Sequence, residues 1–248
     1  MGSRIYHSRW AWRTPFLLSL FYRRSSALAG SGILPQKKNE KSSMTAVLCP
    51  AYLPNITYCS WMVAQQELYF VQDTHFQKQT YRNRTELHGA NGKLKLTIPI
   101  VHAKNTLHQK EADVQIANTT AWQKLHWKSI CSAYRSSPYF EFYEADLAPF
   151  YSTKATLLME FNLTLIKKIM ELIEFPLSYT RVDYDKDIHE RMDILVDAKK
   201  KIALEVTPYN QVFENKNGFI ANLSILDLLF NLGPNTLSYL ENQVPLGN

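Results

Sequence analysis

The side chains best suited to bind an anion are gathered in one short stretch, residues 77–84. It holds Lys78, Arg82, Asn83 and Arg84. A guanidinium group presents a planar fork of N–H donors that can hold a carboxylate or phosphate through two hydrogen bonds, and an asparagine amide can both donate and accept. A hydrophobic core does not require this composition. The stretch is therefore either a solvated basic loop or a substrate-binding loop.

The spacing of the two arginines allows two arrangements. In an extended backbone, Arg82 and Arg84 would lie on the same face and could converge on one anion, with Asn83 facing away. In a turn, Arg82 and Asn83 could share the site while Arg84 pairs with a carboxylate such as Asp73. In both arrangements we expect Arg82 to be buried or to line a cleft.

Two histidines are candidates for a catalytic base. His126 lies in the apolar arc of a helix predicted at 121–136, an arc that also contains Trp122. It is either a hydrogen-bonded core histidine or a base whose pKa is lowered by burial. His75 follows a strand predicted at 68–71 and is the other candidate.

A tyrosine and an aspartate complete the candidate substrate-binding residues. Tyr52 lies between Pro50 and Pro54, in a rigid connection after a predicted strand, where it either faces a ligand or serves as a packing aromatic. Asp227 lies on a narrow polar stripe of an otherwise apolar helix predicted at 218–233. That stripe is either a strip of surface or part of a polar pocket.

The elements that must position these side chains alternate between strands and helices. The apolar patterns predict strands at 46–49, 68–71, 93–100, 175–182 and 202–206. They predict helices at 56–66, 121–136, 139–147, 157–174 and 192–200, and within 218–233 an apolar helix that follows an asparagine N-cap and ends at a Gly-Pro stop. Such alternation is typical of a single three-layer α/β domain with a mostly parallel, Rossmann-like sheet, in which ligands bind at the carboxyl ends of the strands. We expect the 93–100 segment, which contains Pro99, to pair antiparallel or at an edge.

The distribution of charge argues against nucleic acid as a partner. The net charge is +6, but the first 43 residues hold eight lysines and arginines against one glutamate, so the rest of the chain is close to neutral. Three cysteines without a CxxC spacing indicate neither a disulfide framework nor a zinc site, and they fit a reducing cytoplasm. The sequence contains no P-loop and no GxGxxG motif, and it does not identify a cofactor.

The first 43 residues differ in composition from the remainder. Their apolar run at 15–22 is too short to span a bilayer, and Arg23 and Arg24 follow it in the wrong order for a secretory signal. We interpret residues 1–43 as a disordered extension, or as the result of a start codon assigned too early, with Met44 as the natural start. Residues 44–248 are then the folded domain, without stable insertion in a membrane.

Six segments in order give the chain a family resemblance: Pro50–Pro54, Gln77–Arg84, Leu94–Pro99, Trp122–Ile130, Ala133–Phe140 and Asn222–Phe230. Together they make residues 44–248 resemble the WbqC-like protein family of bacteria, in the form found in Bacteroidetes. Members of that family resemble enzymes of surface-polysaccharide or O-antigen gene clusters, and glycine transfer onto an amino sugar has been suggested for one branch. This chain has Leu48 and Cys49 where members commonly carry Gln or His before the first proline.

The resemblance and the basic stretch together predict a cytoplasmic transferase acting on a nucleotide-linked or phosphate-linked sugar. In this hypothesis the basic stretch holds the phosphate or carboxylate, Asn83 orients the acceptor, and His126 or His75 acts as the base. The alternative is a non-catalytic binding or scaffold protein of the same glycan pathway. The absence of metal-ligand spacings disfavours a zinc enzyme.

Overall fold

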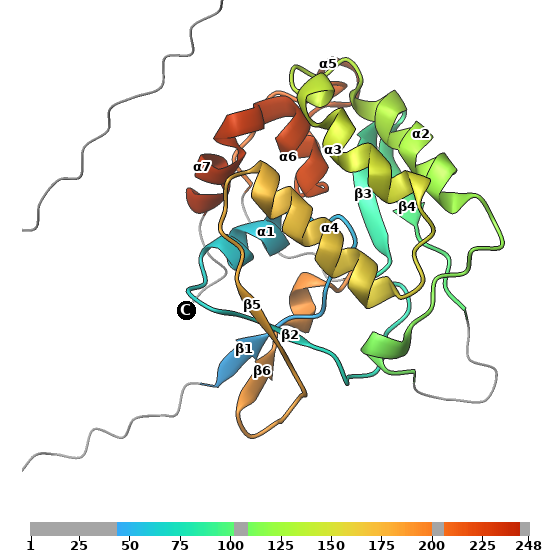
Figure 1. Ribbon diagram of the computed structural model, residues 1–248. Helices are drawn as coiled ribbons and strands as arrows, with labels where there is room; N and C mark the ends of the chain where they lie inside the picture. The colour runs from blue at the N-terminus through green and yellow to red at the C-terminus, as the bar shows by residue number, and fades with distance from the viewer. Residues whose placement is uncertain (1–43, 102–108, 200–205, 244–248) are drawn as a thin grey trace, which may run out of the picture. The chain divides into compact units, whose positions relative to one another are not determined.

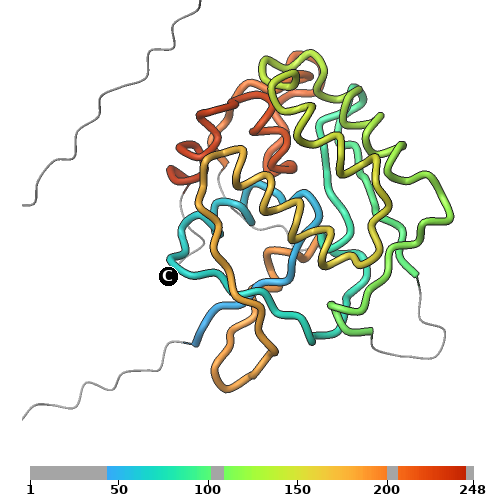
Figure 2. The backbone as a smooth tube through the Cα atoms, viewed as in Figure 1, coloured from blue at the N-terminus to red at the C-terminus, as the bar shows by residue number. Residues whose placement is uncertain are grey.

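The structure is a computed structural model that describes residues 44–101, 109–199 and 206–243. Its parallel strands pair two by two: β1 (Thr45–Val47) with β6 (His189–Arg191), and β2 (Leu68–Val71) with β5 (Tyr179–Val182). Figure 2 shows that these partners come from distant parts of the chain. A backbone bridge links the two pairs, because Leu48 N donates to Tyr69 O at 2.9 Å and Val71 N donates to Leu48 O at 2.9 Å. The carboxyl ends of all four strands therefore point the same way.

A β-hairpin follows the basic stretch. β3 (Arg84–Gly89) pairs antiparallel with β4 (Gly92–Thr97), as expected for the segment at 93–100. Gly92 has φ +95°, a conformation that glycine adopts without steric cost. β3 was not among the predicted strands, since its first residues carry the charges of the basic stretch.

Seven helices and three 3₁₀ turns occur in the described ranges (Figure 1). The helices are α1 (Ile56–Val63), α2 (Trp122–Tyr134), α3 (Phe140–Ser152), α4 (Leu158–Leu172), α5 (Glu214–Asn217), α6 (Ile225–Leu232) and α7 (Thr236–Glu241). The 3₁₀ turns are η1 (Glu111–Asp113), η2 (Asp193–Leu195) and η3 (Gly233–Asn235). α4 buries its apolar side in the core, and α2 packs against both α3 and β3.

The mixed α/β character agrees with the sequence, whereas the strands in the described ranges are not assigned to one continuous sheet. The described strands are three to six residues long and pair as three two-stranded sheets. Prolines limit their length, because Pro50 and Pro99 lie just beyond β1 and β4 and cannot donate to a ladder. The Rossmann-like, three-layer form of the prediction is therefore not confirmed, and most of the predicted strand 202–206 lies outside the described residues.

Two local predictions were wrong. A helix was expected at 192–200, but the described residues of that segment form only the turn η2; the charged residues just before it contain β6, which was not among the predicted strands. β6 is three residues long and carries two charges, so no apolar pattern announced it; its pairing with β1 decides its conformation. The helix predicted within 218–233 is α6, which begins at Ile225 with Ser224, and not an asparagine, as its N-cap.

The glycine at the end of α6 allows a mutational test of how tightly the chain packs there. Gly233 has φ +53°, and a Cβ there would lie 2.5 Å from Cδ1 of Tyr139, so we expect Gly233→Ala to lower the unfolding free energy by about 2–4 kcal/mol. The control is Gly218→Ala, at φ +71° in open space, which should cost about 1 kcal/mol. Urea denaturation of both variants measures the difference, and equal losses would contradict the packing argument.

Candidate functional site

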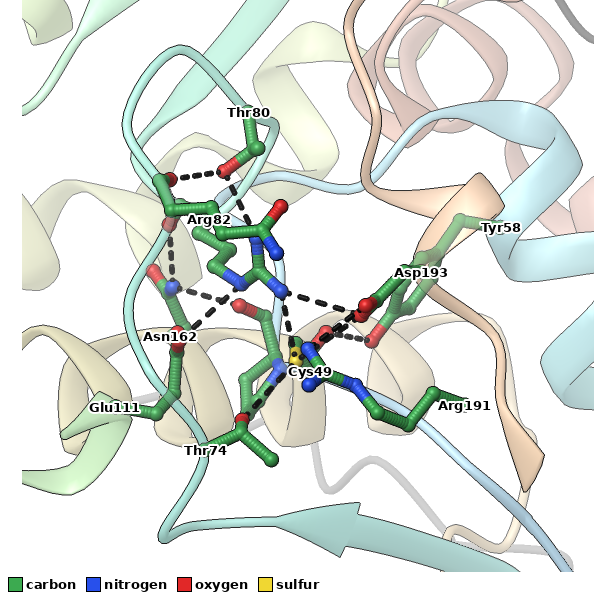
Figure 3. Close-up of polar contacts among 11 residues, drawn as sticks. Cys49, Tyr58, Thr74, Thr80, Arg82, Glu111, Asn162, Arg191 and Asp193 are labelled. Atoms are coloured by element: carbon green, nitrogen blue, oxygen red, sulfur yellow. Dashed lines mark hydrogen bonds and ion pairs between the residues drawn. The ribbon is translucent and has the colours of Figure 1, made fainter. Parts of the chain in front are cut away.

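A buried guanidinium group lies at the centre of the polar interior (Figure 3). Arg82 is 0% exposed, and each of its three side-chain nitrogens contacts a protein group. Nε lies 3.2 Å from Oε2 of Glu111, and Nη2 lies 3.2 Å from Oδ1 of Asp193. Nη1 donates to Oγ1 of Thr80 at 3.4 Å, and Nη2 also donates to Sγ of Cys49 at 3.1 Å. These five residues with Arg191 form what we call the Arg82 network.

The Arg82 network lies at the carboxyl ends of parallel strands, where ligands of α/β proteins collect. Cys49 follows β1, and Asp193 follows β6. Asp193 extends the network outward, since its Oδ2 lies 2.7 Å from Nη2 of Arg191. When Glu111 is ionised, the two carboxylates and the two guanidinium groups therefore alternate in sign and balance in charge.

Burial shapes the titration of this network. It raises the pKa of the Cys49 thiol to about 11, against the opposing effect of Arg82, so the thiol is protonated at neutral pH and is no nucleophile. It raises the pKa of Glu111 to about 7, although the positive charge of Arg82 opposes this. Because protein groups occupy the N–H donors of Arg82, its role in this structure is to organise the interior.

The same network fixes the loop after β1. Asn162 of α4 donates to the carbonyl of Arg82 at 2.7 Å and to that of Pro50 at 3.2 Å. The backbone N–H of Tyr52 donates to the carbonyl of Tyr81 at 2.9 Å. The basic stretch and the Pro50–Pro54 loop are thereby held together, and Tyr52 has a defined position.

Tyr52 belongs to a buried chain of hydrogen bonds. Its hydroxyl lies 2.9 Å from Nδ1 of His126 and 3.0 Å from the hydroxyl of Tyr151, and we call these three residues the tyrosine–histidine relay. Burial lowers the pKa of His126 to about 4, while a hydrogen bond with the Thr97 backbone opposes the shift. Because Nδ1 faces Tyr52, we assign the bond with Thr97 to Nε2–H; in that tautomer Nδ1 of the neutral ring accepts from the Tyr52 hydroxyl.

A polar pocket lies beside the relay. Tyr151 lines this cavity of about 370 Å³ together with Lys124, Lys154 and residues 118–121 before α2. No carboxylate lines the pocket, and within the described residues neither lysine forms an ion pair. The N-terminal N–H groups of α2 add to the positive potential. The polar pocket therefore suits an anionic, hydrogen-bonding ligand.

The other members of the basic stretch are dispersed. The stretch turns rather than extends, and Asn83 is buried, donating to the carbonyl of Ile98 at 2.9 Å. Arg84 is half-buried at the start of β3 and forms no ion pair within the described residues. The expected Arg84–Asp73 pair is absent there, because Asp73 accepts from the backbone N–H of Tyr184 at 2.7 Å. Lys78 is exposed and likewise forms no described ion pair.

The two remaining candidates lie apart from the relay contacts. His75 is exposed and bridges Lys110 through its backbone. Asp227 is fully buried in a polar cluster, where Tyr209 donates to its Oδ2 at 2.5 Å and Gln211 at 2.9 Å. The stripe on α6 is therefore no strip of surface. Burial raises the pKa of Asp227, and its neighbours tie the 206–213 segment to α6.

Sequence reasoning missed Tyr151, Glu111 and Asp193. Glu111 lies in a polar segment and Asp193 in a stretch predicted as a helix, so only their three-dimensional proximity to Arg82 identifies them. Tyr151 lies near the end of α3, beyond the helix predicted at 139–147, so it was not among the candidate residues.

The Arg82 network yields a stability prediction. Arg82→Ala would leave Glu111 buried without a counter-charge, and we expect a loss of about 3–5 kcal/mol in unfolding free energy at pH 8. Arg82→Lys should recover little, because an ammonium group cannot reach Glu111, Asp193 and Thr80 together. Chemical denaturation compares both with Arg84→Ala, which should lose about 1 kcal/mol or less. If Arg84→Ala lowered the unfolding free energy as much as Arg82→Ala, the central role of the Arg82 network would be contradicted.

Glu111 yields a pH prediction. Its pKa rises from 4.5 to about 7 on folding, so the stability given by the bound proton is complete below pH 4.5 and is lost as the pH rises through 7. Glu111→Gln cannot ionise, so it should lack this loss, which is on the order of 3 kcal/mol. Urea denaturation from about pH 4.5 to 8 compares the wild type, Glu111→Gln and the exposed control Glu141→Gln. If the unfolding free energies of the wild type and Glu111→Gln changed with pH in the same way, the raised pKa of Glu111 would be refuted.

Comparisons with known proteins place these groups in a family. The sequence model of the WbqC-like protein family matches residues 49–205, which include the Arg82 network, the relay and the polar pocket but not Asp227. An uncharacterised protein of Mycobacterium tuberculosis, Rv1507c, is 26% identical over 231 residues that cover 79% of this chain and 96% of the relative. No solved structure matches the chain.

None of the described helices is long and apolar enough to cross a membrane, and the described residues contain no group of three metal-ligating side chains. The match over more than half of the chain shows that it belongs to the WbqC-like protein family.

Proposed function

We propose that this protein is a cytoplasmic transferase of bacterial surface-polysaccharide biosynthesis. Its substrate is a phosphate-linked or nucleotide-linked amino sugar, and the group transferred is an aminoacyl group such as glycine. The observation that carries the proposal is the relay, which connects the polar pocket to a neutral histidine through hydrogen bonds of 3.0 and 2.9 Å. Family membership supports the pathway, and the free Cys49, Cys59 and Cys131 support a reducing compartment.

The relay gives each residue a role in acyl transfer. The sugar amine attacks the carbonyl carbon of an activated aminoacyl ester or thioester, so an N–C bond forms as the C–O or C–S bond breaks. The amine proton passes to Tyr151, the Tyr151 proton to Tyr52, and the Tyr52 proton to Nδ1 of His126. The same path in reverse returns a proton to the leaving alcohol or thiol.

The charged groups divide into binding and positioning roles. Lys124 and Lys154 bind the phosphate in the polar pocket, because they are the cations that line it. Arg82 acts as a positioning residue, since its network fixes the loop that carries Tyr52. Lys78 and Arg84 remain available for a second anionic group, such as the nucleotide part of the donor or acceptor.

Tyr151→Phe tests the proposal, because it removes one hydroxyl from the relay and leaves the ring in place. The purified protein is mixed with glucosamine 1-phosphate and a glycyl thioester, and mass spectrometry measures the new amide. We expect about a 100-fold slower transfer in Tyr151→Phe, and about wild-type transfer in Tyr143→Phe, which changes a tyrosine of the same helix outside the relay.

Two results would overturn this assignment. Equal rates in Tyr151→Phe and the wild type would remove the relay from the reaction. Binding of glucosamine 1-phosphate by the wild type, in calorimetry, without any amide product from a series of glycyl esters and thioesters would support the non-catalytic binding protein instead.

A further inference from the structure

A second cavity, the apolar groove, lies between the end of α3 and the start of α4. Its volume is about 440 Å³, and its walls include Pro149, Phe150, Ala155, Leu157 and Phe161. Figure 1 shows that α3 and α4 follow one another along the chain through a short connection. Residues 153–157 of this connection also line the groove. Apolar side chains that line an open groove in water favour an apolar occupant.

The apolar groove and the polar pocket share a wall. Lys154 lines both cavities, and Tyr151 and Phe150, which are consecutive in α3, line the pocket and the groove respectively. The ring of Phe161 in the groove packs against the ring of Tyr52, with centroids 6.1 Å apart. A single ligand can therefore occupy the groove and the pocket with Lys154 at its midpoint, beside the relay.

The charges around the groove favour an anion at that midpoint. Glu160 is the one carboxylate on the groove wall, and Arg181 holds it through two hydrogen bonds of 2.5 and 2.7 Å. Its negative charge is thus matched within the protein. Lys154 has no such partner in the described residues, so the free charge at the junction is positive.

We propose that the apolar groove binds the aliphatic chain of a lipid-linked form of the substrate, whose phosphate lies at Lys154 and whose sugar enters the polar pocket. The position of the sugar rests on the proposed function, whereas the chain and phosphate rest on the groove and Lys154 alone. A methylene occupies nearly the volume of a water molecule, about 30 Å³, so the groove has room for a chain of roughly fifteen carbons. The amino sugar would thus be presented on a lipid phosphate and not only on a nucleotide.

The probe that tests this inference is farnesyl phosphate, which joins an aliphatic chain of that size to a phosphate. Calorimetry measures its binding to the full chain below its critical micelle concentration. Thr164 lies on the groove wall and is exposed, so Thr164→Trp fills the groove from the surface and should weaken binding about tenfold or more. The matched control Thr180→Trp, at an exposed position of β5 outside the groove, should bind as the wild type does.

A second variant separates the chain from the phosphate. Lys154→Gln changes an exposed residue, so its folding is not at risk, and it should weaken farnesyl phosphate about tenfold while leaving farnesol unchanged. Undiminished binding of farnesyl phosphate by Thr164→Trp, or equal binding by Lys154→Gln and the wild type, would overturn the inference. Self-association of the wild type without binding of farnesyl phosphate would also overturn it and assign the groove to a protein contact.

The two proposals fail in different ways. Binding of farnesyl phosphate without transfer of glycine to glucosamine 1-phosphate would overturn the proposed function and support the groove. Transfer to glucosamine 1-phosphate without any binding of farnesyl phosphate would overturn the groove and support the proposed function.

Discussion

The ion pairs between Arg82 and the carboxylates of Glu111 and Asp193 are the interaction on which the interior depends. A buried guanidinium group is stable only when its charge and its N–H donors are matched, and here two carboxylates, a hydroxyl and a thiol supply the partners. The matched group orders the backbone around it. Through Asn162 and the loop at Pro50, that order extends to Tyr52 and hence to the relay.

The sequence carried enough information to find the centre of the interior but not its role. An arginine in a basic stretch between strand-like segments was expected to be buried or to line a cleft, and Arg82 is fully buried. Its expected neighbour Arg84 begins β3 instead, because the stretch turns before the hairpin starts. The positions of charged residues along the chain do not reveal which carboxylates, distant in sequence, will form ion pairs with a given arginine.

The long helices and the apolar strands were predicted well, whereas the charged strands were missed, for one physical reason. α2 and α4 carry apolar arcs long enough to show a helical period, so the sequence marks them within a few residues. β6 and the strand β3 carry charges and gain their conformation from a partner strand, which no local pattern records. The sequence places His126 in the apolar arc of α2, but its hydrogen bond to Tyr52 depends on how the loop after β1 is folded.

The separation of Arg82 and Asp193 along the chain has a consequence for how the protein folds. These residues lie 111 positions apart, and β1 and β6 join ends even more distant. Closing so long a loop costs conformational entropy before any contact repays it, which places these contacts late in folding. Until then Arg82 remains hydrated. Desolvation of its charge is thus coupled to the arrival of the last parallel strand, and a nascent chain released before residue 193 would lack a closed interior.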